Sequence, residues 1–180
     1  MEYTVIRSDR KTVAIQITRD GEVVVRCPRG TSGKEIQAIV ESRRDWIEAH
    51  LKKYTAQPAV PKLTQAQVEA LADQALDAIP RLVRQYAPKV GVTYGRITIR
   101  NQKTRWGSCS SGGNLNFNCL LMLTPPGVQA YVVVHELCHR KEMNHSKAFY
   151  SEVLRVFPDY WKWDKWLKEN GDKLMRRMMG

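Results

Sequence analysis

Two histidines four residues apart, with a glutamate directly after the first, are the residues in this sequence best suited to chemistry. They are His135, Glu136 and His139. On an α-helix, residues four positions apart lie one turn apart on the same face, so two neutral imidazoles can reach one metal ion. Glu136 lies about 100° further round the helix. It therefore need not be a ligand and can act as a base on water held by the metal.

A third histidine, His145, follows six residues after His139. In an unbroken helix it would lie about 15 Å along the axis from His135, too far away to share an ion. We therefore expect the helix to end after His139, with Asn144 in the turn because asparagine tolerates the left-handed conformation. Glu142 lies two turns from His135 and is not expected to be a ligand. The pattern predicts one Zn²⁺ ion held by three histidines.

The residues before this motif indicate a helix that is buried on all sides. Thr124 is a candidate cap, and Pro125 suits the first turn. The stripe that carries the histidines is apolar, and so are the other faces, which hold Val133, Val134, Leu137 and Cys138.

The composition is that of an ordinary globular protein. The chain has 180 residues, 43% hydrophobic and 26% charged, and suits one domain or one domain with a small appendage. No apolar run reaches the roughly 18 residues of a membrane span, and the start of the chain lacks a signal-peptide pattern. The four cysteines form no CxxC pair, which predicts reduced thiols and a cytoplasmic protein.

The net charge of +11 is spread along the chain without a run of lysines and arginines. This charge favours an anionic substrate or partner. Nucleic acid stays open as a partner, although no motif indicates it. The oligomeric state cannot be read from the sequence.

Residues 1–55 predict a β-hairpin followed by a helix. Apolar residues alternate with polar ones over residues 13–17, Asp20-Gly21 forms a turn, and residues 23–25 return as the second strand. A capping box of Ser32 and Glu35 opens one helix that continues to the end of this region.

Residues 64–180 predict the catalytic domain, after a linker at residues 55–63. Thr64 and Gln67 form a second capping box, opening a helix that Pro80 should kink or split. Strands are expected at residues 94–100 and 115–118, with a loop at residues 103–113 between them.

The C-terminal part predicts two helices after the metal motif. Ser146 can cap the first, and Pro158 closes it. An aromatic-rich helix follows, with Gly171 as its stop, and the basic tail at residues 173–180 is expected to fray. The pattern as a whole predicts an α+β fold in which the motif helix packs on a small sheet.

Three segments together resemble the YgjP-like family of zinc-dependent hydrolases. They are residues 104–109 (TRWGSC), 134–139 (VHELCH) and 144–150 (NHSKAFY). The resemblance implies a zincin-type fold related to metallopeptidases, with His135, His139 and His145 as metal ligands and Glu136 as the catalytic residue. Glu142 stands where metzincins carry glycine, so the chain is not placed among metzincins.

Four residues are candidates for binding the substrate. Arg105 is a permanent, planar cation that could hold a carboxylate or phosphate, or could instead anchor its loop. Trp106 and Ser108 could shape the pocket or support the glycine between them, and Tyr150 could stabilise an oxyanion.

Three functions remain open at this stage. The first is a zinc metallopeptidase that binds an extended peptide along an exposed strand. The second is a nucleotide pyrophosphatase, because some members of the family carry the label UTP pyrophosphatase. The third is a nucleic-acid-associated zinc protease, because SprT-like proteases share the general zincin plan.

Overall fold

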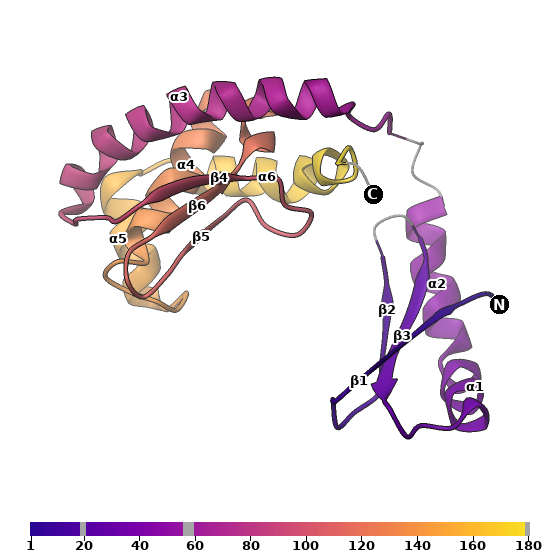
Figure 1. Ribbon diagram of the computed structural model, residues 1–180. Helices are drawn as coiled ribbons and strands as arrows, with labels where there is room; N and C mark the ends of the chain where they lie inside the picture. Colours follow the sequence, from indigo (N-terminus) through magenta and orange to yellow (C-terminus); the bar gives the residue numbers. More distant parts are fainter. Residues whose placement is uncertain (19–20, 56–59, 179–180) are drawn as a thin grey trace. The chain divides into compact units, whose positions relative to one another are not determined.

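The computed structural model describes residues 1–18, 21–55 and 60–178, which group into two compact units, Met1–Val60 and Pro61–Gly180 (Figure 1). Both units contain helices and a small sheet, so the fold class is α+β, as predicted. Among the described helices, none combines the length and the apolar character that crossing a membrane requires.

The first unit contains a three-stranded sheet. Strands β1 (Thr4–Ser8), β2 (Ala14–Ile17) and β3 (Val23–Pro28) lie in the order β1-β3-β2, with β1 parallel and β2 antiparallel to β3. β2 and β3 form the predicted hairpin, but Asp20 of its turn lies outside the described residues. Strand β1 is an addition to the predicted elements, because its apolar residues are adjacent and do not alternate with polar ones.

The predicted single helix of this unit is divided into α1 (Gly33–Ser42) and α2 (Arg44–Thr55). Its capping box is present: Ser32 Oγ accepts from the Glu35 amide, and the Glu35 carboxylate accepts from the Ser32 amide. The break follows Ser42, whose hydroxyl donates to the carbonyl of Ile39 at 2.8 Å. A serine bonded to the backbone in this way competes with helical hydrogen bonding.

The second unit packs four α-helices and a 3-10 helix against a three-stranded sheet. The helices are α3 (Gln65–Val90), η1 (Cys119–Leu123), α4 (Pro126–Cys138), α5 (Lys147–Val156) and α6 (Tyr160–Met175). The strands are β4 (Ile97–Arg100), β5 (Gly107–Cys109) and β6 (Leu115–Asn118). Their order is β4-β6-β5, with β4 parallel and β5 antiparallel to β6, so β5 is an edge strand (Figure 1).

The sheet differs from the prediction in one strand. β4 and β6 lie within the predicted strand regions, but β5 occupies part of the segment predicted as a loop. Its sequence, Gly-Ser-Cys, has no large apolar residue and therefore no strand signal of its own. Pairing with β6, which sets Gly107 opposite Phe117, makes this segment a strand.

Helix α3 is continuous, so the prediction that Pro80 splits it is wrong. Its capping box at Thr64 and Gln67 is present as predicted. A proline at position 80 cannot donate to the carbonyl of Leu76, four residues earlier. Because Leu76 is 59% exposed, water can satisfy that carbonyl without breaking the helix.

Helix α4, which carries the metal motif, is buried as predicted. Val133, Val134 and Leu137 are fully buried, and the helix packs against α3, α5, α6 and the sheet. Thr124 does not cap it, contrary to the prediction, because the Thr124 hydroxyl donates to the Leu121 carbonyl of η1 at 2.7 Å. The helix begins at Pro126 without a side-chain cap.

The C-terminal part is more ordered than predicted. Helix α6 continues through Gly171 to Met175, and the indole of Trp106 lies over Gly171, where an added Cβ would be 3.2 Å from Nε1. The predicted fraying of the tail is wrong up to residue 178, since Met175 and Met178 belong to the core. Residues 179 and 180 lie outside the described part of the chain.

Replacing Ser146 by alanine tests the anchoring of α5, the helix that follows His145. Ser146 Oγ accepts a hydrogen bond from the Phe149 amide at 3.3 Å. Loss of such a cap costs about 1 kcal/mol, so Ser146→Ala should lower the melting temperature by a few degrees. Ser151→Ala is the matched control, because the exposed Ser151 hydroxyl bonds only the Lys147 carbonyl within the same helix. Equal melting temperatures for the two variants would contradict this role for the cap.

Candidate metal centre

The three predicted ligands come together at the carboxyl end of α4 and the beginning of α5. Ring nitrogens of His135, His139 and His145 all lie within 4.8 Å of one another, and the Nε2 atoms of His135 and His145 are 2.9 Å apart. Phe149 packs against all three rings, at centroid distances from 4.6 to 4.9 Å. Each ring can offer one nitrogen to a single ion, so these residues fit Zn²⁺.

Helix α4 ends directly after Cys138, which lets the chain turn back and bring His145 to the other two histidines. His139 is its C-cap, and the amides of Lys141 and Glu142 both donate to the Cys138 carbonyl to close the turn. Asn144 is not left-handed, contrary to the prediction, because no described residue other than glycine has a positive φ. The two hydrogen bonds to the Cys138 carbonyl reverse the chain here without a residue in the left-handed conformation.

A backbone carbonyl fixes the orientation of one imidazole. Nδ1 of His139 lies 3.0 Å from the carbonyl oxygen of Glu142. Because a carbonyl can only accept, Nδ1 carries the proton and Nε2 is left for the metal. Glu142 thus contributes its backbone, and its carboxylate is not part of the cluster.

Burial favours the neutral, metal-binding form of His135 and His139. Desolvation, together with the neighbouring imidazoles, lowers the pKa of His135 to about 3, while Asp164 has the opposite effect. Desolvation also lowers the pKa of His139. The hydroxyl of Tyr131 donates to Asp164 at 3.0 Å, and the Tyr131 ring lies edge-on to His135. A neutral imidazole can donate its lone pair at physiological pH.

Glu136 is buried directly beneath strand β5. A Cβ added at Gly107 would lie 2.7 Å from Glu136 Oε1, so only glycine lets the strand approach the carboxyl group this closely. Desolvation raises the pKa of Glu136 to about 8, against the lowering effect of the Arg105 charge. A raised pKa means that this carboxyl group holds a proton more readily than a free glutamate does, which suits a group that takes up and then releases a proton.

Arg105 lies in the segment that joins β4 to β5, and its side chain is exposed. Among the described residues, no hydrogen bond or ion pair engages its guanidinium group. The loop is held by Asn118, which is fully buried and donates from Nδ2 to the carbonyls of Gln102 at 2.6 Å and Arg105 at 3.0 Å. Hydrogen bonds to backbone carbonyls therefore anchor the loop. The positive charge of Arg105 lowers the pKa of Glu136, against the effect of burial.

The other three candidate substrate residues lie in different places. Trp106 packs on Gly171, away from the three histidines. Ser108 Oγ accepts from Asn116 Nδ2 at 3.2 Å, on the sheet face opposite to the one that Gly107 turns toward Glu136. Tyr150 is 39% exposed, and its ring centroid lies 6.2 Å from that of His145. Of the three, Tyr150 borders the metal cluster.

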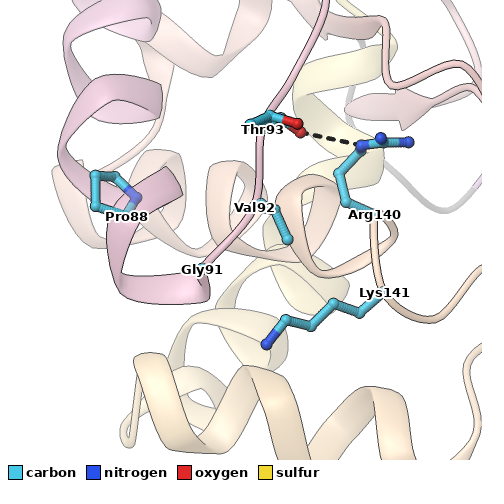
Figure 2. A pocket seen from close by; sticks show the side chains of 6 residues that line it. All are labelled: Pro88, Gly91, Val92, Thr93, Arg140 and Lys141. Carbon is cyan, nitrogen blue, oxygen red and sulfur yellow. Dashed lines mark hydrogen bonds between the residues drawn. The ribbon is translucent and has the colours of Figure 1, made fainter.

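Arg140, directly after His139, was not among the candidate residues. Its Nε donates to the Thr93 carbonyl at 3.1 Å and its Nη1 to the Ser111 carbonyl at 3.0 Å. Arg140 lines an open hollow of about 620 Å³, and Figure 2 shows its side chain among the six that line this hollow. Both contacts are with backbone, so Arg140 ties the end of α4 to the β5–β6 turn.

Three supporting residues were missed, for different reasons. Asn118 could have been noticed as a polar residue inside an otherwise apolar stretch, between Phe117 and Cys119. Gly107 and Arg140 carried no such signal, because their roles depend on Glu136 and on carbonyl groups distant in the sequence.

Comparison with known families agrees with this arrangement of three histidines and a buried glutamate. The family model "YgjP-like, metallopeptidase domain" matches residues 11–71 and 61–170. The chain belongs to this family. No functionally curated protein matches it significantly in sequence.

Two crystal structures are similar to part of the chain, and both are metallopeptidase zymogens. Abylysin from Pyrococcus abyssi is 22% identical, with a TM-score of 0.46, over 51% of this chain and 93% of abylysin. Jannalysin from Methanocaldococcus jannaschii is 20% identical, also with a TM-score of 0.46, over 52% of this chain and 97% of jannalysin.

Removing one histidine at a time tests the metal centre. His135→Ala, His139→Ala and His145→Ala should each reduce the zinc content of the purified protein sharply, because two imidazoles cannot replace three. The matched control is His50→Ala, since His50 stacks on Trp46 in the first unit. Zinc content is measured by elemental analysis after dialysis. Full occupancy in His145→Ala would disprove the three-histidine assignment and point to Glu142 or Glu152.

Proposed function

We propose that this protein is a zinc metallopeptidase that cleaves peptide bonds in extended polypeptide segments. The observation that carries the proposal is the position of edge strand β5 directly against Glu136, the residue that follows His135. An enzyme that cleaves a peptide bond must hold an extended backbone next to its catalytic groups, and an edge strand can do so by hydrogen bonding.

The pairing of β5 supports this mode of binding. The amide of Asn118 donates to the Trp106 carbonyl, and the amide of Ser110 donates to the Asn114 carbonyl. In an antiparallel ladder the bonded residues alternate, so the backbone groups of Gly107 and Cys109 point away from β6. These outward N–H and C=O groups are available to a substrate strand.

The chemistry divides between the ion and the protein. When bound by the three histidines, zinc would polarise the scissile carbonyl and make water more acidic. Glu136 takes a proton from the attacking water as the water oxygen bonds to the carbonyl carbon, and delivers that proton to the amine that leaves. Its burial keeps competing solvent away from the carboxylate.

We infer that two other residues contact the substrate. Arg105 brings a positive charge that influences Glu136, and its guanidinium can hold a carboxylate of the substrate. Tyr150 presents a hydroxyl group beside His145, where it can donate to a developing oxyanion. We assign Arg105 to substrate binding and Tyr150 to stabilising the transition state.

Replacing Glu136 by glutamine tests the proposal most directly. The zinc-loaded protein should cleave members of a peptide library, and Glu136→Gln should lose this activity by at least about a hundredfold while keeping its zinc, because the amide cannot accept the proton. Products are identified by mass spectrometry, with a nucleoside triphosphate panel assayed in parallel. Cleavage of nucleotides but not peptides, lost in Glu136→Gln, would replace the peptidase by a pyrophosphatase.

Gly107→Ala tests whether β5 must lie close to Glu136. The added Cβ would be 2.7 Å from Oε1, so the strand or the carboxylate must move and peptide hydrolysis should fall by about tenfold or more. Zinc content should stay unchanged. Gly112→Ala is the matched control, because a Cβ there meets nothing nearer than Ser110 Oγ at 3.9 Å. Equal activity of both variants would show that the close approach is not needed.

A further inference from the structure

The open face of the sheet β4-β6-β5 is polar and carries no carboxylate. Leu115 and Phe117 point into the core, so their neighbours along the strands point to the other face. A chain of hydrogen bonds crosses all three strands there: Arg100 Nε donates to Asn116 Oδ1 at 3.5 Å, and Asn116 Nδ2 donates to Ser108 Oγ at 3.2 Å. Thr98 lies in the same row.

The charge of this region has one sign. Residues 78–135, which include the whole sheet, contain no aspartate or glutamate. They contain seven basic residues, Arg81, Arg84, Lys89, Arg96, Arg100, Lys103 and Arg105. The last four lie together, on β4 and next to it. A face with this excess of basic side chains attracts anions.

The positive charges of Arg96 and Arg100 are not balanced by a carboxylate of the described chain. Arg96 and Arg100 are exposed, and within the described chain no ion pair engages either guanidinium group. Arg100 ends strand β4 and Arg96 directly precedes it, so they are four residues apart in extended chain, or about 13 Å. Two guanidinium groups without a carboxylate partner, at this spacing, can contact separate charges of one extended polyanion.

We propose that this face, formed by Arg96, Thr98, Arg100, Asn116 and Ser108, binds the phosphate backbone of nucleic acid. Arginine, threonine, serine and asparagine side chains are among those that contact phosphate and sugar oxygens in such complexes. None of the five side chains is aromatic, so bases are not stacked and binding is independent of sequence. Binding of this kind needs neither the metal nor hydrolysis, so it stands apart from the proposed peptidase activity.

The test measures the fluorescence anisotropy of a labelled, mixed-sequence single-stranded DNA of about 20 nucleotides. The zinc-loaded full chain is titrated at several salt concentrations between 50 and 200 mM. The double variant Arg96→Gln/Arg100→Gln should bind about tenfold more weakly at the lowest salt. The slope of log K against log salt should become shallower by about 1.4, because about 0.7 is lost for each phosphate contact removed from a single strand.

The matched control is Arg81→Gln/Lys165→Gln, which removes the same charge from exposed positions on α3 and α6. It should bind like the unaltered protein, and both double variants should keep their melting temperature and zinc content. Equal weakening by the two variants would overturn the proposal in favour of non-specific attraction by net charge. Absence of salt-dependent binding by the unaltered protein would overturn it outright. Displacement of the DNA by polyglutamate as effectively as by unlabelled DNA would show an acidic-polypeptide site instead.

Discussion

The burial of helix α4 is the constraint on which the metal centre depends. Apolar residues on every side of the helix hold it between α3, the sheet and the C-terminal helices, and each fully buried side chain of this size contributes about 1.5–3 kcal/mol. The same burial removes water from His135 and Glu136. Both pKa shifts follow mainly from this loss of solvent: His135 is kept neutral, and the carboxyl group of Glu136 holds a proton more readily than a free glutamate does. Burying these two titratable side chains costs folding free energy, and the apolar contacts of the helix offset that cost.

What could be predicted from the sequence was mostly local. The caps at Ser32, Thr64 and Ser146 involve a side chain and a backbone group three residues away, so a short sequence determines them. The spacing of His135, Glu136 and His139 is likewise local, and the end of α4 before His145 followed from helix geometry alone. These predictions needed no knowledge of what packs against each segment.

What could not be predicted depends on partners far away in the sequence. Gly107–Cys109 becomes a strand through β6, and Gly171 stays helical where Trp106 fills the space that a side chain would need. Thr124 does not cap α4 because the N-cap position is Pro125, one residue later, and the Thr124 hydroxyl donates to the Leu121 carbonyl of η1. Pairing and packing of this kind outweigh weak local preferences. The catalytic motif was therefore readable, whereas its supports, Asn118 and Arg140, were not.

The two ends of the second unit are joined by a backbone hydrogen bond, because the amide of Leu63 donates to the carbonyl of Arg177 at 2.7 Å. Leu63 and Met178 are both buried, so this junction is sealed by apolar packing as well. A unit whose ends meet can be inserted into another polypeptide, or reconnected end to end and opened elsewhere, without stretching its core. The second unit therefore has the topology of a transferable module, one that evolution or protein engineering can attach to different neighbours while the cluster of three histidines stays intact.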